Sequence, residues 1–518
     1  MNKTKLIWAA VLLFTASCAN EDVSKETESD RQNNKVLTTF TSGDAPATRT
    51  TIDYTVGGTG KFFWELGDNI FVTDDSGTPV ASTSSTITGK TDYAKFQVSG
   101  TFTSTGYAVY YTGKNSTHAT SVTIAANQTQ SAPNDFSHLS TSGDCGTATA
   151  TGSGSEFAFK LKHQAAYLCL LPRSTNPLIA QFVIESVSVT ADKDIAGDFA
   201  LASTGLAATP TANGSKTITV STPDLALTNA TSPATNAVYV VMAPQTTALN
   251  IVYHLKNTAT GMTGTVSKNI PTQAFEANKI YDLTSNLGHD YSEEMKPYMW
   301  DAKKWYYDGK TAPYNYPADA PQSKATDPDR WFNDEFTLGT SAIAQNSCKD
   351  CPTAIQLTWY CCFYPYYDEN ELYTVDGKVY KGVTRLKKWA YLVADHGASL
   401  VAIPTTVPPN ANAWDSSTGI PGYTGDIIPN ASHFNVDAGL PAPAEMKKYF
   451  ALPYTYDDLT INEQGTYWAS TGSPRTTGQF PPNLSAAYIC FAGSYMWVST
   501  GNYIERSRDH AYYVVKFE

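Results

Sequence analysis

The sequence predicts a mainly β protein, with two β-sandwich domains in tandem followed by a domain that mixes helices with a sheet. Short runs of β-branched and aromatic residues, separated by Gly, Ser, Asn and Asp, recur from residue 50 to residue 287. Helical patterns appear only after residue 345. The chain is 42% hydrophobic but only 16% charged, so its 518 residues can bury several cores.

The N-terminus has the features of a secretory signal peptide, which we assign to residues 1–17. Lys3 and Lys5 precede the apolar run Leu6–Phe14, which is too short to cross a bilayer of about 30 Å as a helix. The small residues before Cys18 resemble a bacterial lipobox. This implies lipidation of Cys18 and anchoring in the outer membrane, with simple secretion as the alternative.

Residues 18–49 are polar and nearly free of aromatic residues. Such a segment buries too little apolar surface to order itself, so we predict a disordered tether or propeptide. One stretch within it, Val36–Thr41, has the composition of a strand.

Residues 50–165 and 166–288 are expected to form the two sandwiches. Ala94–Val98 alternates apolar and polar residues, as a half-buried strand does, and Tyr107–Tyr111 is dense in aromatics. We interpret Phe157–Leu171 as one central strand that leads into the second domain.

This part of the chain resembles the Bacteroidetes-type fimbrillin-like pilus subunits and surface lipoproteins. The resemblance covers about residues 19–287 and rests on Cys18, Thr48–Ile52, Phe63–Phe71 and Ala277–Leu283. It implies transthyretin-like sandwiches. In pilus-forming members an arginine-specific protease removes the N-terminal strand, and a neighbouring subunit donates a strand to the groove left behind.

Arg49 and Thr50 lie where the resemblance places that cut. The exchange is physically sensible, because stripping a strand exposes unpaired backbone groups that a foreign strand can satisfy. The expected partners are therefore other pilus subunits. The alternative is that Arg49 is only an exposed residue of the tether.

The last domain is expected to span residues 289–518. Ala354–Cys362 and Leu386–His396 are helix candidates, Asp376-Gly377 predicts a hairpin, and Gly465–Glu518 contains three or four strands. The domain resembles the major-paralogous-domain group, which is similar to C-type-lectin-like folds. The resemblance rests on Phe450–Pro453, Gly465–Thr471, Ala487–Phe491 and Ser507–Phe517.

Cysteines cluster in the last domain. An exported chain favours disulfides, and the candidates are Cys348, Cys351, Cys361, Cys362 and Cys490, with the pairing undetermined. Zinc is the alternative for the first four. However, the adjacent second pair leaves no loop to wrap a tetrahedral ion, so we expect no metal site.

A ligand surface is expected near the C-terminus, where aromatic residues alternate with small ones and charges follow. Its candidate residues are Tyr495, Trp497, Tyr503, Arg506 and Asp509. The alternative is that these rings belong to the core, since large rings carry much of the burial energy. No calcium-binding lectin motif is present.

The sequence contains no recognisable catalytic motif, so we expect no enzyme, no catalytic residue and no cofactor. A formal net charge of −12 without a basic cluster argues against nucleic acid as a partner. The interpretation is a lipid-anchored surface adhesin at the tip of, or accessory to, a pilus, with a glycan or protein ligand. The alternative is a non-polymerising glycan-binding lipoprotein of the outer membrane.

Overall fold

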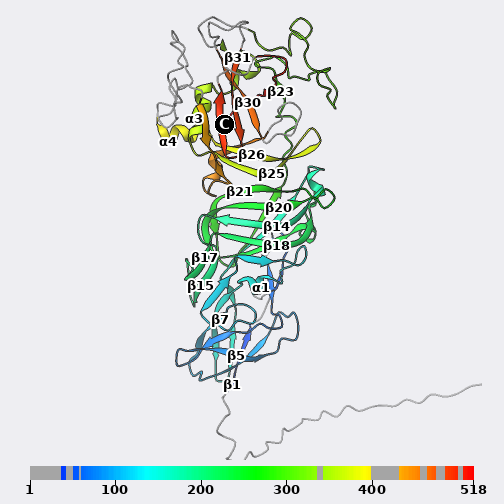
Figure 1. Ribbon diagram of the computed structural model, residues 1–518. Coiled ribbons are helices and arrows are strands. Elements are labelled where there is room, and N and C mark those ends of the chain that lie inside the picture. The colour runs from blue at the N-terminus through cyan, green and yellow to red at the C-terminus, as the bar shows by residue number, and fades with distance from the viewer. Residues whose placement is uncertain are drawn as a thin grey trace, which may run out of the picture.

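The computed structural model describes residues 37–42, 51–57, 60–334, 342–397, 431–454, 464–473, 485–499 and 506–518. They form a mainly β structure, as predicted, in which the sheets follow one another along an elongated molecule (Figure 1). Strands β1 (Leu37–Ser42) and β5 (Pro79–Ser85) lie at one end, and β30 (Gly465–Ser473) and β31 (Ser485–Ala492) lie at the other.

The N-terminal sheet closes on itself. Its order is β11-β1-β6-β5-β4-β7-β10-β12, and a further pairing joins β10 to β11. Fully buried aromatic rings, among them Phe40, Trp64 and Tyr111, fill its interior. Its other strands are β4 (Phe71–Thr73), β6 (Lys95–Ser99), β7 (Gly106–Tyr111), β10 (Gly146–Ser153), β11 (Glu156–Phe159) and β12 (Lys162–His163).

Strand β1 corrects the expectation that the whole of residues 18–49 is a disordered tether. Thr38, Phe40 and Ser42 are buried, and the residues between them are less so, which is the two-residue period of a strand with one face in a core. The strand suspected at Val36–Thr41 is therefore confirmed.

The middle of the chain is a β-sandwich. One layer contains β9, β18, β14, β20 and β21, and the other has the order β19-β13-β22. The two layers share one apolar core, and the Tyr253 hydroxyl donates to Ser285 Oγ across it at 3.2 Å. The strands are β9 (Asn127–Thr129), β13 (Ala166–Arg173), β14 (Val183–Ala191), β18 (Thr217–Ala226), β19 (Val238–Met242), β20 (Gln245–Lys256), β21 (Thr263–Phe275) and β22 (Ile280–Asn286).

The first two units interlock. β8 and β9 precede residue 166 but pair with β15 and β18 of the second unit. The stretch Phe157–Leu171, which we interpreted as one strand, is divided among β11, β12 and β13. The remaining elements here are β2 (Thr51–Asp53), β3 (Lys61–Phe63), β8 (Ser121–Ile124), β15 (Ala196–Ala202), β16 (Gly205–Leu206), β17 (Ala212–Ser215), and the short helices α1 (Leu139–Ser142), η1 (Ile179–Gln181) and α2 (Pro233–Asn236).

The terminal unit is built on a sheet of order β23-β33-β30-β31-β32-β27, with β24 also paired to β30. Successive residues of β30 pack on opposite faces of the sheet. Tyr467 packs in the core that includes α3, and Trp468 packs with residues around Trp300. The elements are β23 (Pro297–Tyr298), β24 (Ala342–Ile343), η2 (Ser347–Asp350), α3 (Ala354–Cys362), α4 (Trp389–His396), β27 (Ala431–Asn435), η5 (Met446–Lys448), β32 (Tyr495–Ser499) and β33 (Tyr512–Tyr513).

A hairpin joins the terminal unit to the sandwich. β25 (Tyr366–Val375) and β26 (Lys378–Lys387) turn at Asp376-Gly377, as predicted, and β25 continues the sandwich layer beside β21 through the pair Thr265 and Glu371. β28 (Asp437–Ala438) and β29 (Tyr449–Pro453) complete this sheet. Within the described segments, no helix is long and apolar enough to span a bilayer.

Candidate functional site

The first candidate site is strand β1, which lies between two neighbours. It pairs antiparallel with β6 and parallel with β11, so Phe40 has Phe96 on one side and Phe157 on the other. Ser42 is joined to Ala94, the residue before β6, by both backbone and side-chain hydrogen bonds, and its Oγ accepts from the Ala94 N–H at 2.9 Å. The N-terminal strand is thus an interior member of the closed sheet.

Phe40 fixes this strand in the core. Its ring stacks on Phe157 at 5.2 Å and meets the edge of Phe102 at 5.1 Å. Removing β1 would leave the β6 and β11 backbones unpaired and would empty a site lined by aromatic rings. Both changes are costly unless another strand takes its place.

The hairpin that follows β1 in the described chain contacts both the first sheet and the second unit. Arg49 and Thr50 lie outside the described residues, and the described chain resumes at β2, which pairs with β3. The Tyr54 hydroxyl donates to Asp282 Oδ2 of β22 at 2.6 Å, and Phe62 stacks on His163 at 3.9 Å. Burial, followed by the Asp282 carboxylate, raises the pKa of the Tyr54 phenol.

This arrangement separates β1 from the residues that follow it. β1 belongs to the first sheet, whereas the β2–β3 hairpin is held by the sandwich core through Tyr54 and Phe62. A cut between Ser42 and Thr51 would therefore detach β1 without releasing the hairpin.

The second candidate site is the surface of the terminal unit, where the four described residues of the predicted ligand set differ in exposure and do not form one surface. Tyr495 is 46% exposed at the start of β32, whereas Trp497 packs partly buried against the core around Trp300. Tyr503 lies outside the described residues.

The structure corrects the prediction that Arg506 belongs to a ligand surface, because only 4% of this residue is exposed. Its guanidinium lies 3.8 Å from the centroid of the Trp300 ring, and Nη1 donates to the Asn333 carbonyl at 2.9 Å. Burial lowers the pKa of Arg506 to about 10. The side chain therefore supports the fold, since a cation over a buried ring is a packing contact.

Asp509, by contrast, is exposed and belongs to a surface group that the sequence did not indicate. It accepts from the Tyr316 hydroxyl at 2.6 Å and lies 3.4 Å from Arg508 Nε. Tyr316 belongs to residues 288–330, a stretch rich in Tyr, Pro and Asp that reads as a linker. The sequence offered one signal for this site, a Tyr directly before Pro317 in a polar stretch. Only the fold brings this Tyr to Asp509.

The expected disulfides are absent from the described residues, where no disulfide bond joins any two cysteines. The sheet itself keeps the candidates in two groups. Cys348, Cys351 and Cys490 pack on the Trp300 side, whereas Cys361 and Cys362 of α3 pack on the opposite side. Burial raises the pKa of Cys362 to about 12, so this thiol stays protonated at neutral pH.

In the described part of the chain, no three His, Cys, Asp or Glu side chains gather as a metal site. His163 Nδ1 and Asp144 Oδ1 lie 2.7 Å apart, and a His–Asp contact of this kind also occurs in catalytic sites. Here both side chains are buried inside the protein beside Tyr167. Without access for a substrate, they read as a structural pair.

No protein-family model and no curated protein matches this chain. Solved structures that are similar include a candidate cell adhesion protein from Bacteroides ovatus ATCC 8483 (14% identity, 44% of this chain and 85% of that chain, TM-score 0.31). Others are a candidate polysaccharide binding protein from Bacteroides thetaiotaomicron VPI-5482 (11%, 48% and 92%, 0.25) and a fimbrial assembly protein from Parabacteroides distasonis ATCC 8503 (11%, 48% and 91%, 0.24). At TM-scores this low, the role of the chain has to be argued from its own residues.

Proposed function

We propose that this protein is a non-enzymatic cell-surface adhesin, a tip or accessory subunit of a fimbrillin-type pilus assembled by strand exchange. The observation that carries the proposal is the place of β1, an interior strand of the first sheet, followed in the described chain by a hairpin region whose Tyr54 and Phe62 belong to the sandwich core. The resemblance of residues 19–287 to fimbrillin-like subunits supports the same role.

The energetics favour replacement over simple loss of the strand. Each edge that β1 leaves behind presents unpaired N–H and C=O groups, and a foreign strand can satisfy both edges at once. The incoming strand would need a large apolar residue in the register of Phe40, flanked two residues away on each side by small ones, as Thr38 and Ser42 flank it now.

The terminal unit supports a position at the end of an assembly. β25 covers part of the β21 edge, and Arg385 Nη2 donates to Glu371 at 2.6 Å and to Ser267 of β21 at 2.9 Å. Asn250 and Asn269 add bonds to the carbonyls of Pro441 and Pro443, each at 2.9 Å. A domain fixed in this way projects rigidly from the sandwich, which suits the display of a binding surface.

Anchoring is the remaining part of the proposal. Lipidation of Cys18 would hold the unprocessed chain at the outer membrane. A cut after Arg49 would break the covalent link between the subunit and the segment that carries both the anchor and β1. Replacing Cys18 by Ser should then abolish lipid labelling and release unprocessed protein from the membrane fraction.

Arg49→Ala tests the assembly step. In cells, we expect this variant to retain β1 and to lose polymers that resist SDS. The matched control is Arg31→Ala, because a cut at Arg31 would lie before β1 and cannot empty its groove. Unchanged processing and assembly of the Arg49→Ala variant would contradict the pilus part of the proposal.

The second candidate function is a glycan-binding lipoprotein that does not polymerise. The exposed group around Tyr316 and Asp509 favours it, since that group belongs to the terminal unit and β1 belongs to the first sheet. Purified protein that stays monomeric after cleavage at Arg49, yet binds sugar, would establish this alternative.

A further inference from the structure

We propose that Tyr316, Gln322, Arg508 and Asp509 form a binding site for neutral carbohydrate on the terminal unit. The inference rests on the adhesin role proposed above and names the class of ligand. It assigns recognition to a loop between β23 and β24, together with the turn before β33, and not to the strands β31 and β32.

Three exposed side chains and the half-buried Arg508 form one hydrogen-bonded group. Tyr316 is 42% exposed, and its hydroxyl donates to Asp509 Oδ1 at 2.6 Å. Arg508 Nε lies 3.4 Å from the same oxygen, and its Nη1 donates to Gln322 Oε1 at 3.1 Å. One exposed aromatic ring is thus bordered by a carboxylate, a guanidinium and an amide.

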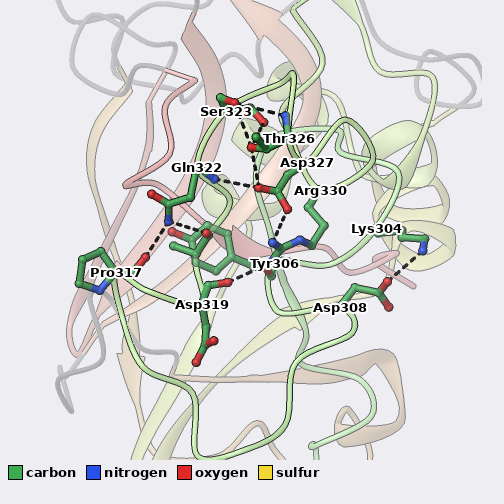
Figure 2. Close-up of polar contacts among 11 residues, drawn as sticks. Lys304, Tyr306, Asp308, Pro317, Asp319, Gln322, Ser323, Thr326, Asp327 and Arg330 are labelled. Atoms are coloured by element: carbon green, nitrogen blue, oxygen red, sulfur yellow. Dashed lines mark hydrogen bonds and ion pairs between the residues drawn. The ribbon is translucent and has the colours of Figure 1, made fainter.

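The loop that carries Tyr316 and Gln322 is held from inside the protein. The Gln322 amide nitrogen donates to the carbonyls of Pro317 and Ala320, at 2.8 Å and 2.7 Å, and its backbone N–H donates to Asp327 Oδ2 at 3.0 Å (Figure 2). Asp327 in turn forms an ion pair with Arg330, which is only 8% exposed.

Arg330 also connects the two ends of this loop. Its Nη1 donates to the carbonyls of Tyr306 and Asp319, at 2.8 Å and 2.9 Å (Figure 2). The hydroxyl of the buried Tyr306 donates to the carbonyl of Arg508 at 2.7 Å, which links the loop to the turn that carries Asp509. The exposed group is therefore positioned before any ligand arrives, and this lowers the entropic cost of binding.

The group fits a neutral sugar. A pyranose presents a face of C–H groups that can pack on an exposed ring and a rim of hydroxyls that both donate and accept. Asp509 supplies acceptors and Arg508 supplies donors, both in charge-assisted bonds, and Gln322 Oε1 supplies a further acceptor. An anionic ligand is disfavoured by Asp509 and by the formal net charge of −12.

The chain supplies a matched control. Tyr495 is 46% exposed, close to the 42% of Tyr316, and it lies on β32, which is separated from β33 by β30 and β31 in the sheet order. It also belongs to the ligand surface predicted from the sequence. Comparing the two tyrosines therefore tests one surface against the other.

The experiment uses residues 19–518 as a soluble monomer on an array of neutral and acidic oligosaccharides, with calorimetry on the strongest neutral binder. We expect saturable binding that weakens about tenfold or more in Tyr316→Ala and Asp509→Asn, with unchanged melting temperature, and that is unaltered in Tyr495→Ala. Tyr316→Phe keeps the ring but loses the bond to Asp509, so it should fall between wild type and Tyr316→Ala.

Absence of binding to every neutral oligosaccharide would overturn the proposal. So would preference for acidic sugars, or loss of binding in Tyr495→Ala but not in Tyr316→Ala. The Arg49→Ala protein should bind sugar as wild type does. Wild-type protein that binds sugar but does not assemble after cleavage would refute the pilus role alone. Wild-type protein that assembles but does not bind sugar would refute this site alone.

Discussion

Phe40 of β1 stacks on Phe157 of β11, with ring centroids 5.2 Å apart and planes inclined by 16°. The two rings come from strands that run parallel, although they are far apart in the sequence. Because Phe40 is fully buried, this contact sets the register of β1 in the closed sheet. It is also the contact that a replacing strand would have to reproduce.

Phe40→Ala should loosen β1 in the intact chain. Loss of a fully buried phenylalanine ring costs about 3–5 kcal/mol, and the cavity would open between β6 and β11. Hydrogen exchange on peptides covering these two strands should show faster exchange. Leu37→Ala is the control on the same strand, because that side chain is 50% exposed and should change exchange little.

Asp301→Ala should destabilise the terminal unit. The buried carboxylate accepts from the backbone N–H groups of Gln345, Asn346 and Cys348, at 2.7, 2.7 and 3.1 Å, so its removal leaves three donors unsatisfied. Each orphaned donor costs about 1–3 kcal/mol.

Chemical denaturation followed by near-UV circular dichroism would report this loss, since Trp300 lies next to Asp301. Asp308→Ala is the control, because its contact with Lys304 is at the surface. Equal unfolding midpoints for the two variants would show that the Asp301 network does not stabilise the unit.

Local signals in the sequence predicted much of the fold. Composition indicated β1, alternation placed β6, and Asp376-Gly377 placed a hairpin. The start of α3 is fixed by a capping box between Thr353 and Gln356. The second predicted helix begins at Trp389 rather than Leu386, because Leu386 pairs with Phe450 as part of β26. These features depend on residues close in sequence.

The site was harder to predict because its contacts are long-range. Tyr316 and Asp509 are 193 positions apart, so no local pattern joins them. Arg506 reads as an exposed charge until the fold places Trp300 beneath it. Cys348 and Cys351 are close in sequence to Cys361 and Cys362, yet the two pairs pack on opposite faces of the sheet. Residue type alone does not indicate on which face of a sheet a side chain packs.

Glu371→Gln should loosen the junction between the sandwich and the terminal unit. Glu371 and Arg385 have side chains that are 16% and 6% exposed, and removing one charge from such a pair costs about 3–5 kcal/mol. Limited proteolysis should then cut faster between the two units. Glu185→Gln alters an ion pair with 38% and 40% exposed side chains, so it should have little effect, and similar cleavage of both variants would contradict a rigid junction.

The pH dependence of sugar binding should report Asp509. The hydrogen bond from Tyr316, and next the bond and charge of Arg508, hold the pKa of Asp509 below its ordinary value of 3.8. Because the folded-state pKa is depressed, the Tyr316–Asp509 contact is at full strength above that ordinary value and is lost as pH falls through the lowered pKa. Binding to a neutral oligosaccharide should therefore stay constant from about pH 8 to pH 5 and decline only in stronger acid. Calorimetry across this range checks the curve, with Asp509→Asn as a weak but flat control; loss of binding already at about pH 6 would contradict the assignment to Asp509.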